Sequence, residues 1–262
     1  AAIGRSRSRR CSAALSSRSD APLGWDPGAD RRVSALLLDG PLVYVAGDFN
    51  VIGGQSRSYV VAVERATGLV TAWDARVDRE VVALARHDTT LFLGGFFENV
   101  GGVARSCLAE VSLVTGTLLP WDATISRHPF YTLDGGPHVN GLLIVNDTLF
   151  VAGSFTSIGG QSRQGLAALD LGTAMSTSWD PRAVRNVVTR ASFWAMAKSG
   201  DTLFVAGAFD SLGGRPGSWI AAVSASTGAR LDWDPRPNSW VWALGLQDGI
   251  LYAGGGFTSM GS

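Results

Sequence analysis

The sequence predicts an all-β protein built from repeated antiparallel units, and two recurring landmarks carry that prediction. A Gly-x-Phe element recurs along the chain, with its phenylalanines at Phe49, Phe97, Phe155, Phe209 and Phe257. A tryptophan closes each unit, at Trp25, Trp73, Trp121, Trp179 and Trp233. A repeat period near fifty residues is typical of an array of similar structural units rather than of one irregular domain.

Each unit contains four short β-favouring runs separated by turn residues. In the first complete unit, the runs are Val33–Leu38, Leu42–Ala46, Tyr59–Glu64 and Leu69–Trp73. Asp39-Gly40, Gly53-Gly54 and Thr67-Gly68 lie between them, where glycine permits a positive φ and the neighbouring side chain hydrogen-bonds the turn. No segment shows a sustained helical period. We therefore expect a four-stranded antiparallel meander in each of the units 33–76, 81–124, 139–182 and 193–236.

Four antiparallel strands in about fifty residues describe one blade of a β-propeller, whose apolar faces are buried only when neighbouring blades stack around an axis. Residues 3–27 resemble the back half of a unit, and residues 241–262 resemble a front half. We expect a single domain over 1–262 with five blades, the fifth being a composite of both ends, because such closure removes exposed sheet edges. The alternative is an excised piece of a larger propeller.

Composition argues against several classes of partner. The chain has 22 basic and 22 acidic residues, and this neutrality disfavours nucleic-acid binding, which needs clustered cations. We interpret the one basic cluster, Arg5–Arg10, as a solvated loop rather than a phosphate patch. No apolar run reaches the roughly 18 residues of a membrane span, so no transmembrane segment is predicted. Cys11 and Cys107 occupy equivalent positions two units apart, beyond disulfide reach.

An arginine lies sixteen residues before the tryptophan in four units, as Arg9, Arg57, Arg105 and Arg163, and an aspartate follows every landmark tryptophan. In the fourth complete unit Gly217 replaces the arginine, and Arg215 is the expected substitute. We interpret these residues as structural ties between arginine and carboxylate or backbone, with a ring of ion-binding sites as the alternative. The Gly-Gly pairs lack a following Lys-Ser or Lys-Thr, so they read as turns. No catalytic residue and no cofactor is predicted.

Four tryptophans depart from the repeat and form a candidate ligand-binding site. Trp194 and Trp242 occupy one equivalent position, where the other units have Ser34, Val82 and Asn140. Strand alternation places them on the face opposite the core, where they join Trp240 and Trp219. Such an aromatic platform suits a carbohydrate, whose apolar face stacks on indoles. Packing between the two units is the interpretation that the repeat favours, and the ligand-binding platform is the alternative.

The largest irregularity is an insertion at 126–138, in a connection between two units. Loops on rigid scaffolds often carry function, so this loop is a candidate contact for a partner protein, with a lineage-specific elaboration as the other interpretation. Its candidate contact residues are Arg127, His128, Phe130, Tyr131 and His138. His128, Asp134 and His138 could ligate a metal, but their spacing matches no recognised site, and no metal is predicted.

The strings LFVAGSFTSIGGQSRQGLAALD (149–170) and TSWDP (177–181) resemble the repeats of the bacterial delta-sixty β-propeller family, and the likeness extends through nearly all of the chain. Fungal cortical-marker proteins have similar repeats. This resemblance implies a secreted or cell-surface scaffold without catalytic residues. The stretch 61–68 with Trp73 is also similar to blades of pyrroloquinoline-quinone dehydrogenases, but the cofactor constellation of those enzymes is missing.

The sequence thus predicts a non-enzymatic structural or protein-binding module of an extracellular or cell-surface assembly, with other protein subunits as its partners. The alternatives are a carbohydrate-binding propeller and an enzyme with a site on the propeller axis.

Overall fold

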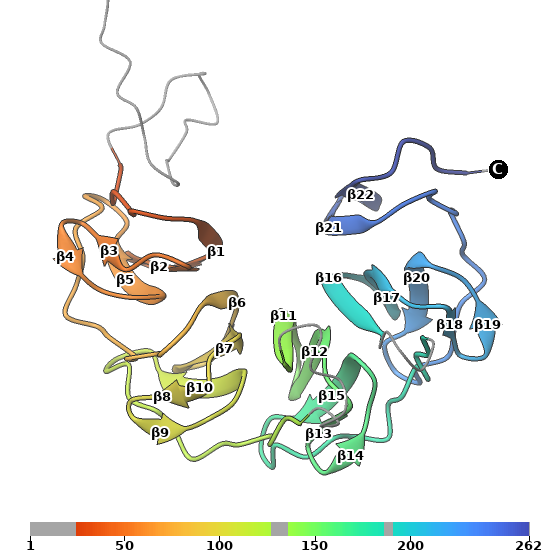
Figure 1. Ribbon diagram of the computed structural model, residues 1–262, viewed down its shortest axis with the longest axis horizontal. Helices are drawn as coiled ribbons and strands as arrows, with labels where there is room; N and C mark the ends of the chain where they lie inside the picture. Colours follow the sequence, from red (N-terminus) through yellow and green to blue (C-terminus); the bar gives the residue numbers. More distant parts are fainter. Residues whose placement is uncertain (1–24, 127–135, 186–190, 262) are drawn as a thin grey trace, which may run out of the picture.

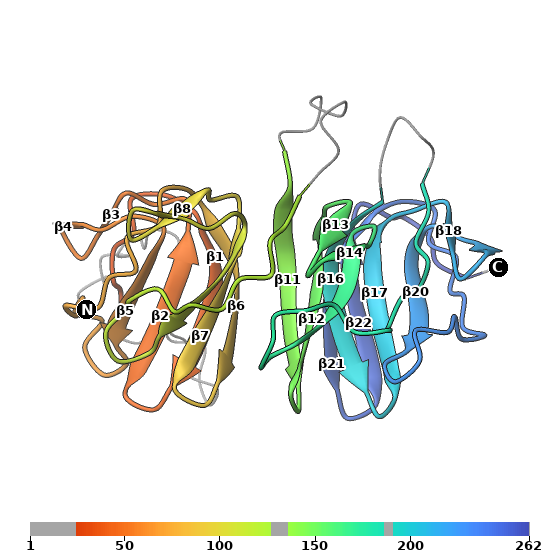
Figure 2. The same cartoon turned by 90° about the horizontal axis from the view of Figure 1, so that it is seen from below.

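The computed structural model describes residues 25–126, 136–185 and 191–261. Every helix or strand assigned within these ranges is a β-strand, so the predicted all-β class is confirmed. The sheets follow one another along an open arc that begins at β1 and ends at β22 (Figure 1). Figure 2, turned by 90°, shows that the long strands of all the sheets run in roughly the same direction, which is the viewing direction of Figure 1. No helix able to cross a membrane occurs in the described part of the chain.

The first two units each form a three-stranded antiparallel sheet and a two-stranded hairpin. The first unit contains β1 (Val33–Asp39), β2 (Leu42–Gly47), β3 (Val51–Ile52), β4 (Gln55–Ser56) and β5 (Val60–Glu64). The second contains β6 (Val81–His87), β7 (Thr90–Gly95), β8 (Asn99–Val100), β9 (Val103–Ala104) and β10 (Leu108–Ser112). In both sheets the middle strand, β2 or β7, pairs with a strand on each side.

The later units repeat this arrangement until the last, which has two described strands. The third unit contains β11 (His138–Val145), β12 (Thr148–Ser154), β13 (Ser157–Ile158), β14 (Gln161–Ser162) and β15 (Leu166–Asp170). The fourth contains β16 (Ser192–Ser199), β17 (Thr202–Ala208), β18 (Ser211–Leu212), β19 (Arg215–Pro216) and β20 (Trp219–Ser224). The fifth contains β21 (Val241–Gln247) and β22 (Ile250–Gly255). The first strands β1, β6, β11, β16 and β21 line the concave side of the arc (Figure 1).

The predicted fourth strand of each unit is reduced to a single β-bridge. These bridges are Val63↔Val70, Val111↔Leu118, Leu169↔Ser176 and Val223↔Arg230. The chain leaves the sheet soon after each bridge because the landmark tryptophan binds the next unit; the Trp73 indole Nε1 donates to the Ser112 carbonyl at 3.1 Å. The expected four-stranded blade is therefore a three-stranded sheet with a very short fourth edge.

Apolar side chains fill the space between adjacent sheets, and aromatic pairs recur at the same place in each interface. One aromatic residue of each middle strand meets the tryptophan that precedes the next sheet, with ring centroids 5.0 to 5.2 Å apart and interplanar angles of 69° to 85°. The pairs are Tyr44–Trp73, Phe92–Trp121, Phe150–Trp179 and Phe204–Trp233. Edge-to-face pairs add about 0.5–1.5 kcal/mol each beyond the burial of apolar area. The landmark tryptophans are thus interface residues.

The predicted five-bladed ring is not confirmed in the described residues. Figure 1 shows an open arc, and β22 pairs only with β21. Residues 1–24, which carry most of the predicted back half of the composite blade, lie outside the described residues. Trp25 is described and packs on the first sheet, with its indole Nε1 donating to the Glu64 carbonyl at 3.2 Å. This contact repeats the one that Trp73 makes with the second sheet.

Candidate functional site

The four tryptophans that depart from the repeat lie together between the fourth and fifth units. Trp240 is at the centre, with its ring centroid 6.2 Å from that of Trp194, 6.0 Å from Trp219 and 6.2 Å from Trp242. The interplanar angles of 56° to 61° show that the rings meet at an angle and do not stack. The predicted juxtaposition of these residues is therefore observed, and we call them the Trp cluster.

A β-bulge near the start of each first strand positions two members of the Trp cluster. The strand register shifts between Phe193 and Ala195 and again between Val241 and Ala243, so Trp194 and Trp242 are the bulged residues. The equivalent residues Ser34, Val82 and Asn140 occupy the same bulge in the other units. Bulges redirect a side chain without disturbing the rest of the ladder. The fold thus supplies this position in every unit, and only two units place an indole there.

Exposure separates the cluster from ordinary interface packing. Trp240 is 48% exposed and Trp242 is 53% exposed, whereas Val241 between them is fully buried. Gly256 lies beside the Trp242 ring, where an added Cβ would be in van der Waals contact with the ring edge at 3.4 Å. Two large indoles with about half of their surface in water present an apolar area that another molecule can cover.

The corresponding contacts between the first and second units are polar. Ser34 Oγ donates to Glu80 Oε1 at 3.1 Å, and Arg32 Nη2 donates to the same oxygen at 2.7 Å. Glu80 occupies the position that Trp240 occupies in the fifth unit. The repeat geometry therefore holds without aromatic residues at these positions, so the Trp cluster is not required by the fold.

Trp219 has a positive φ of 72°, which is unusual for a bulky residue. Tyr59 and Cys107, at the equivalent positions, have φ values of 68° and 65°, and the third unit has Gly165 there with a φ of 70°. The left-handed backbone is thus a property of the repeated unit. It is not a strain specific to the Trp cluster.

The insertion lies mostly outside the described residues, which exclude Arg127, His128, Phe130, Tyr131 and the candidate metal ligand Asp134. His138 is described at the start of β11, where its ring stacks on Phe96 with centroids 4.6 Å apart. Within 25–126, 136–185 and 191–261, no group of three His, Cys, Asp or Glu side chains is placed to hold a metal ion.

The predicted structural ties are present in three units. Arg57 lies 4.0 Å from Asp74, Arg105 pairs with Asp122, and Arg163 lies 3.8 Å from Asp180. Each of these aspartates also accepts a backbone N–H two residues further along the chain. Arg163 additionally donates to the Thr177 carbonyl at 2.8 Å. The repeated arginine thus fastens the tryptophan-containing loop to its own unit, as the structural interpretation predicted.

In the fourth unit, which has Gly217 in place of this arginine, a different arginine takes its position, and the sequence did not predict which one. Arg215 pairs with Asp232 at 3.3 Å, and not with Asp234, which follows the landmark tryptophan. The Arg230 guanidinium instead occupies the space above Gly217, because a Cβ added at Gly217 would lie 3.3 Å from Arg230 Nη1. A glycine at 217 opposite an arginine at 230 is the sequence signal that reveals this exchange.

Three carboxylates away from the Trp cluster have a lowered pKa. A side-chain hydrogen bond from Thr173 lowers the pKa of Asp170, and one from Ser224 lowers that of Asp201. A backbone hydrogen bond from Val51 lowers the pKa of Asp30. These groups stay ionised at neutral pH, and each has a structural hydrogen bond that accounts for its shift.

No protein-family model matches the chain, and no curated protein does. Among solved structures, the computationally designed Ika8 protein matches with a TM-score of 0.53 and 18% identity, over 88% of this chain and 57% of that one. The extracellular domain of a putative one-component system from B. thetaiotaomicron gives 0.57 and 14%, over 85% and 25%. The chain spans less than two thirds of either protein. At these identities the likeness concerns the fold alone.

Proposed function

We propose that the chain forms a β-propeller in which residues 11–16 complete the fifth sheet, in line with its resemblance to the delta-sixty repeat family. Two observations, one at each end of the arc, support this proposal. Tyr252 occupies the position of Tyr44 and Phe92 but is 60% exposed, because no tryptophan packs on it in the described residues. Trp25 is docked on the first sheet like the other landmark tryptophans. Closure would bring Tyr252 against Trp25.

The repeat register specifies the closing contact. In the first unit Val45 lies opposite Val61, and the equivalent residues of the closing sheet are Ala253 and Ala13. Cysteines at directly opposed positions of an antiparallel pair are within disulfide reach. An Ala13→Cys, Ala253→Cys variant carrying Cys11→Ser should therefore form an intramolecular disulfide, visible as a faster band on a non-reducing gel. Burial raises the pKa of Cys107 to about 12, so this thiol does not compete.

The matched control places the first cysteine at Ala14, one residue away, where the strand pleat turns the side chain to the opposite face. This control should not cross-link. A disulfide formed only between two chains, or none at all in the Ala13 variant, would refute closure within one chain.

For its activity, we propose a non-enzymatic structural or protein-binding module of an extracellular or cell-surface assembly, with a second protein subunit bound at the Trp cluster. The half-exposed pair Trp240 and Trp242 carries this proposal. Tryptophan is enriched among the residues that dominate binding energy in protein interfaces. The fold likeness to an extracellular domain agrees with the proposed location, and the repeated arginines and landmark tryptophans are already engaged in holding the units together.

A partner-capture experiment tests the role of the Trp cluster. Trp240→Ala should weaken binding of a stoichiometric protein partner by about 30-fold, the effect of removing a 2 kcal/mol interface residue. Val103→Ala is the control, because Val103 is 53% exposed on β9 of the second unit, away from both the Trp cluster and the proposed closing contact. Affinity for the partner that remains unchanged in Trp240→Ala contradicts the proposal.

A carbohydrate ligand is the second candidate, and the 53% exposure of Trp242 favours it, because indoles stack on the apolar faces of sugars. A glycan array probed with the wild-type chain and Trp242→Ala separates the two candidates. Glycan binding that disappears in the variant identifies a lectin, whereas protein capture without a glycan signal supports the assembly module. Turnover of a defined substrate by the pure chain would refute both in favour of an axial enzyme site.

A further inference from the structure

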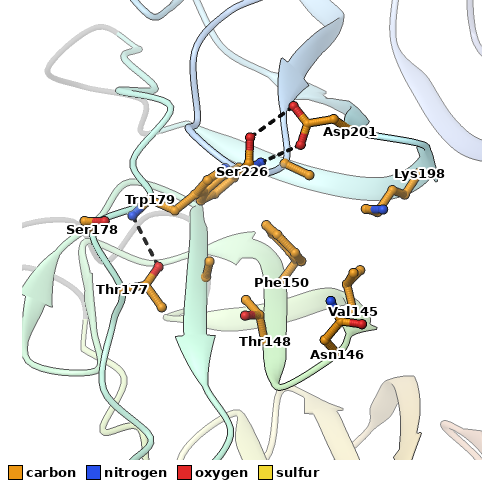
Figure 3. A pocket seen from close by; sticks show the side chains of 12 residues that line it. Val145, Asn146, Thr148, Phe150, Thr177, Ser178, Trp179, Lys198, Asp201 and Ser226 are labelled. Atoms are coloured by element: carbon orange, nitrogen blue, oxygen red, sulfur yellow. Dashed lines mark hydrogen bonds between the residues drawn. The ribbon is translucent and has the colours of Figure 1, made fainter.

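A cavity of about 420 Å³ lies between the third and fourth sheets, away from the Trp cluster. Figure 3 shows that side chains of both units converge on it, with Lys198 and Asp201 on one wall and Asn146 and Thr148 facing them. Its volume falls in the range of small-molecule sites, which are typically apolar with a few convergent polar groups. The pocket combines such an apolar base with one positive and one negative side chain.

A departure from the repeat opens this cavity. Its lining includes Ala225, at a position where the two preceding units have Leu113 and Leu171, which pack into the core between sheets. Between the first two units the space is closed further by Tyr44, whose hydroxyl donates to the Leu113 carbonyl at 3.0 Å. The equivalent residue in the third unit, Phe150, has no hydroxyl. The interface between the third and fourth units therefore lacks two groups, the leucine side chain and the tyrosine hydroxyl, that fill this space between the first and second units.

The two charged side chains of the wall keep hydrogen-bonding capacity beyond their contacts within the chain, because a carboxylate has about four acceptor sites, of which Ser224 and Ser226 use three, and an ammonium has three donors. Lys198, the sole lysine of the sequence, donates to the Gly200 carbonyl at 2.6 Å and pairs with no carboxylate in the described residues. Asp201 accepts from Ser224 Oγ at 2.7 Å and from the Ser226 backbone N–H at 2.9 Å, so its carboxylate is fixed in position. The earlier units have Leu38, Arg86 and Ile144 in place of Lys198, so this charge pair is specific to the cavity.

The base of the cavity suits an aliphatic group better than a sugar ring. Phe150 and Trp179 are 3% and 4% exposed, and they face each other edge-to-face at 5.2 Å. The Trp179 indole N–H is already used, donating to the Ser224 carbonyl at 2.9 Å. Neither ring offers a free face for stacking, whereas the missing leucine side chain at Ala225 leaves a space of aliphatic shape.

We propose that this cavity binds a free aliphatic α-amino acid. The ligand carboxylate pairs with the Lys198 ammonium, the α-ammonium pairs with the Asp201 carboxylate, and the side chain lies against Ala225 and Phe150. A zwitterion matches two opposite charges on one wall of a cavity, and charge-assisted hydrogen bonds are about twice as strong as neutral ones. This site is separate from the Trp cluster, so it does not depend on the function proposed there.

Calorimetric titration of the chain with L-leucine tests the proposal. The wild type should bind, and Ala225→Leu should abolish binding, because it restores the side chain that fills the same space in the two preceding units. Its thermal unfolding should match that of the wild type, which excludes misfolding as the cause of the loss. Retained leucine binding in Ala225→Leu, or no binding by the wild type up to millimolar leucine, overturns the assignment.

Ligand and protein variants then test the charge pairing. Leucine methyl ester, which lacks the carboxylate charge, and N-acetyl-leucine, which lacks the ammonium, should each bind at least about 10-fold more weakly. Lys198→Met should weaken leucine binding to a similar extent but leave the methyl ester unaffected. Asp201→Asn keeps an acceptor for Ser224 and should likewise leave N-acetyl-leucine unaffected. Equal losses for both ligand analogues in both variants would refute the proposed pairing.

Discussion

Phe155→Ala is expected to lower the free energy of unfolding by about 3–5 kcal/mol, the cost of deleting a fully buried aromatic side chain. Phe155 is completely inaccessible to water and belongs to the core shared by the second and third units, together with Trp121 and Val151. Since domains are stable by only about 5–15 kcal/mol, this loss is a large part of the total. Urea unfolding followed by tryptophan fluorescence measures it.

Val114→Ala is the control, because Val114 is 81% exposed in the turn that follows β10. Its loss of stability should be less than about 0.5 kcal/mol, the usual range for a surface substitution. Equal losses at both positions, or a loss below about 1 kcal/mol at Phe155, would contradict the assignment of Phe155 to a core between sheets.

The repeat was sufficient to predict this core because its landmark residues are buried for the same reason in every unit. A residue such as Phe155 recurs at a fixed distance from Trp179 only if each unit places both against its neighbours. The same comparison located the Trp cluster, since Trp194 and Trp242 replace Ser34 and its equivalents at one position. Proximity of these indoles followed from the stacking of neighbouring units.

Features that depend on packing between units could not be derived in this way. The run Leu69–Trp73 has strand propensity, yet it forms one bridge because docking of Trp73 on the second unit draws the chain away. Arg230 compensates for Gly217 through a contact between separate turns. The cavity at Ala225 arises from a missing side chain, and an alanine in a strand-rich sequence gives no signal of empty space. Each case concerns volume, which a pattern of residue types does not encode.

Gly153→Ala is expected to destabilise the chain by about 1–3 kcal/mol or more, the range for forcing extra volume into a packed site. A Cβ at Gly153 would lie 2.2 Å from the His138 carbonyl oxygen, which is backbone and cannot move aside as a flexible side chain does. The β-bulge after Val139 creates this close approach. Thermal unfolding monitored by circular dichroism measures the expected fall in melting temperature.

The same constraint explains why glycine is half of the Gly-x-Phe landmark. At the equivalent positions Gly47, Gly95, Gly207 and Gly255, a Cβ would lie 2.0 to 2.3 Å from a carbonyl oxygen. Gly254 is the matched control for Gly153: it precedes one of these positions, and its nearest contact would be 4.0 Å, so Gly254→Ala should change stability by less than about 0.5 kcal/mol. Similar melting temperatures for the Gly153 and Gly254 variants would refute the bulge as the reason for glycine. A loss of stability in Gly153→Ala but not in Gly254→Ala would show that one backbone geometry explains the whole Gly-x-Phe landmark. In this geometry the bulged first strand leaves no space for a side chain at the glycine, and the phenylalanine two residues later fills the core.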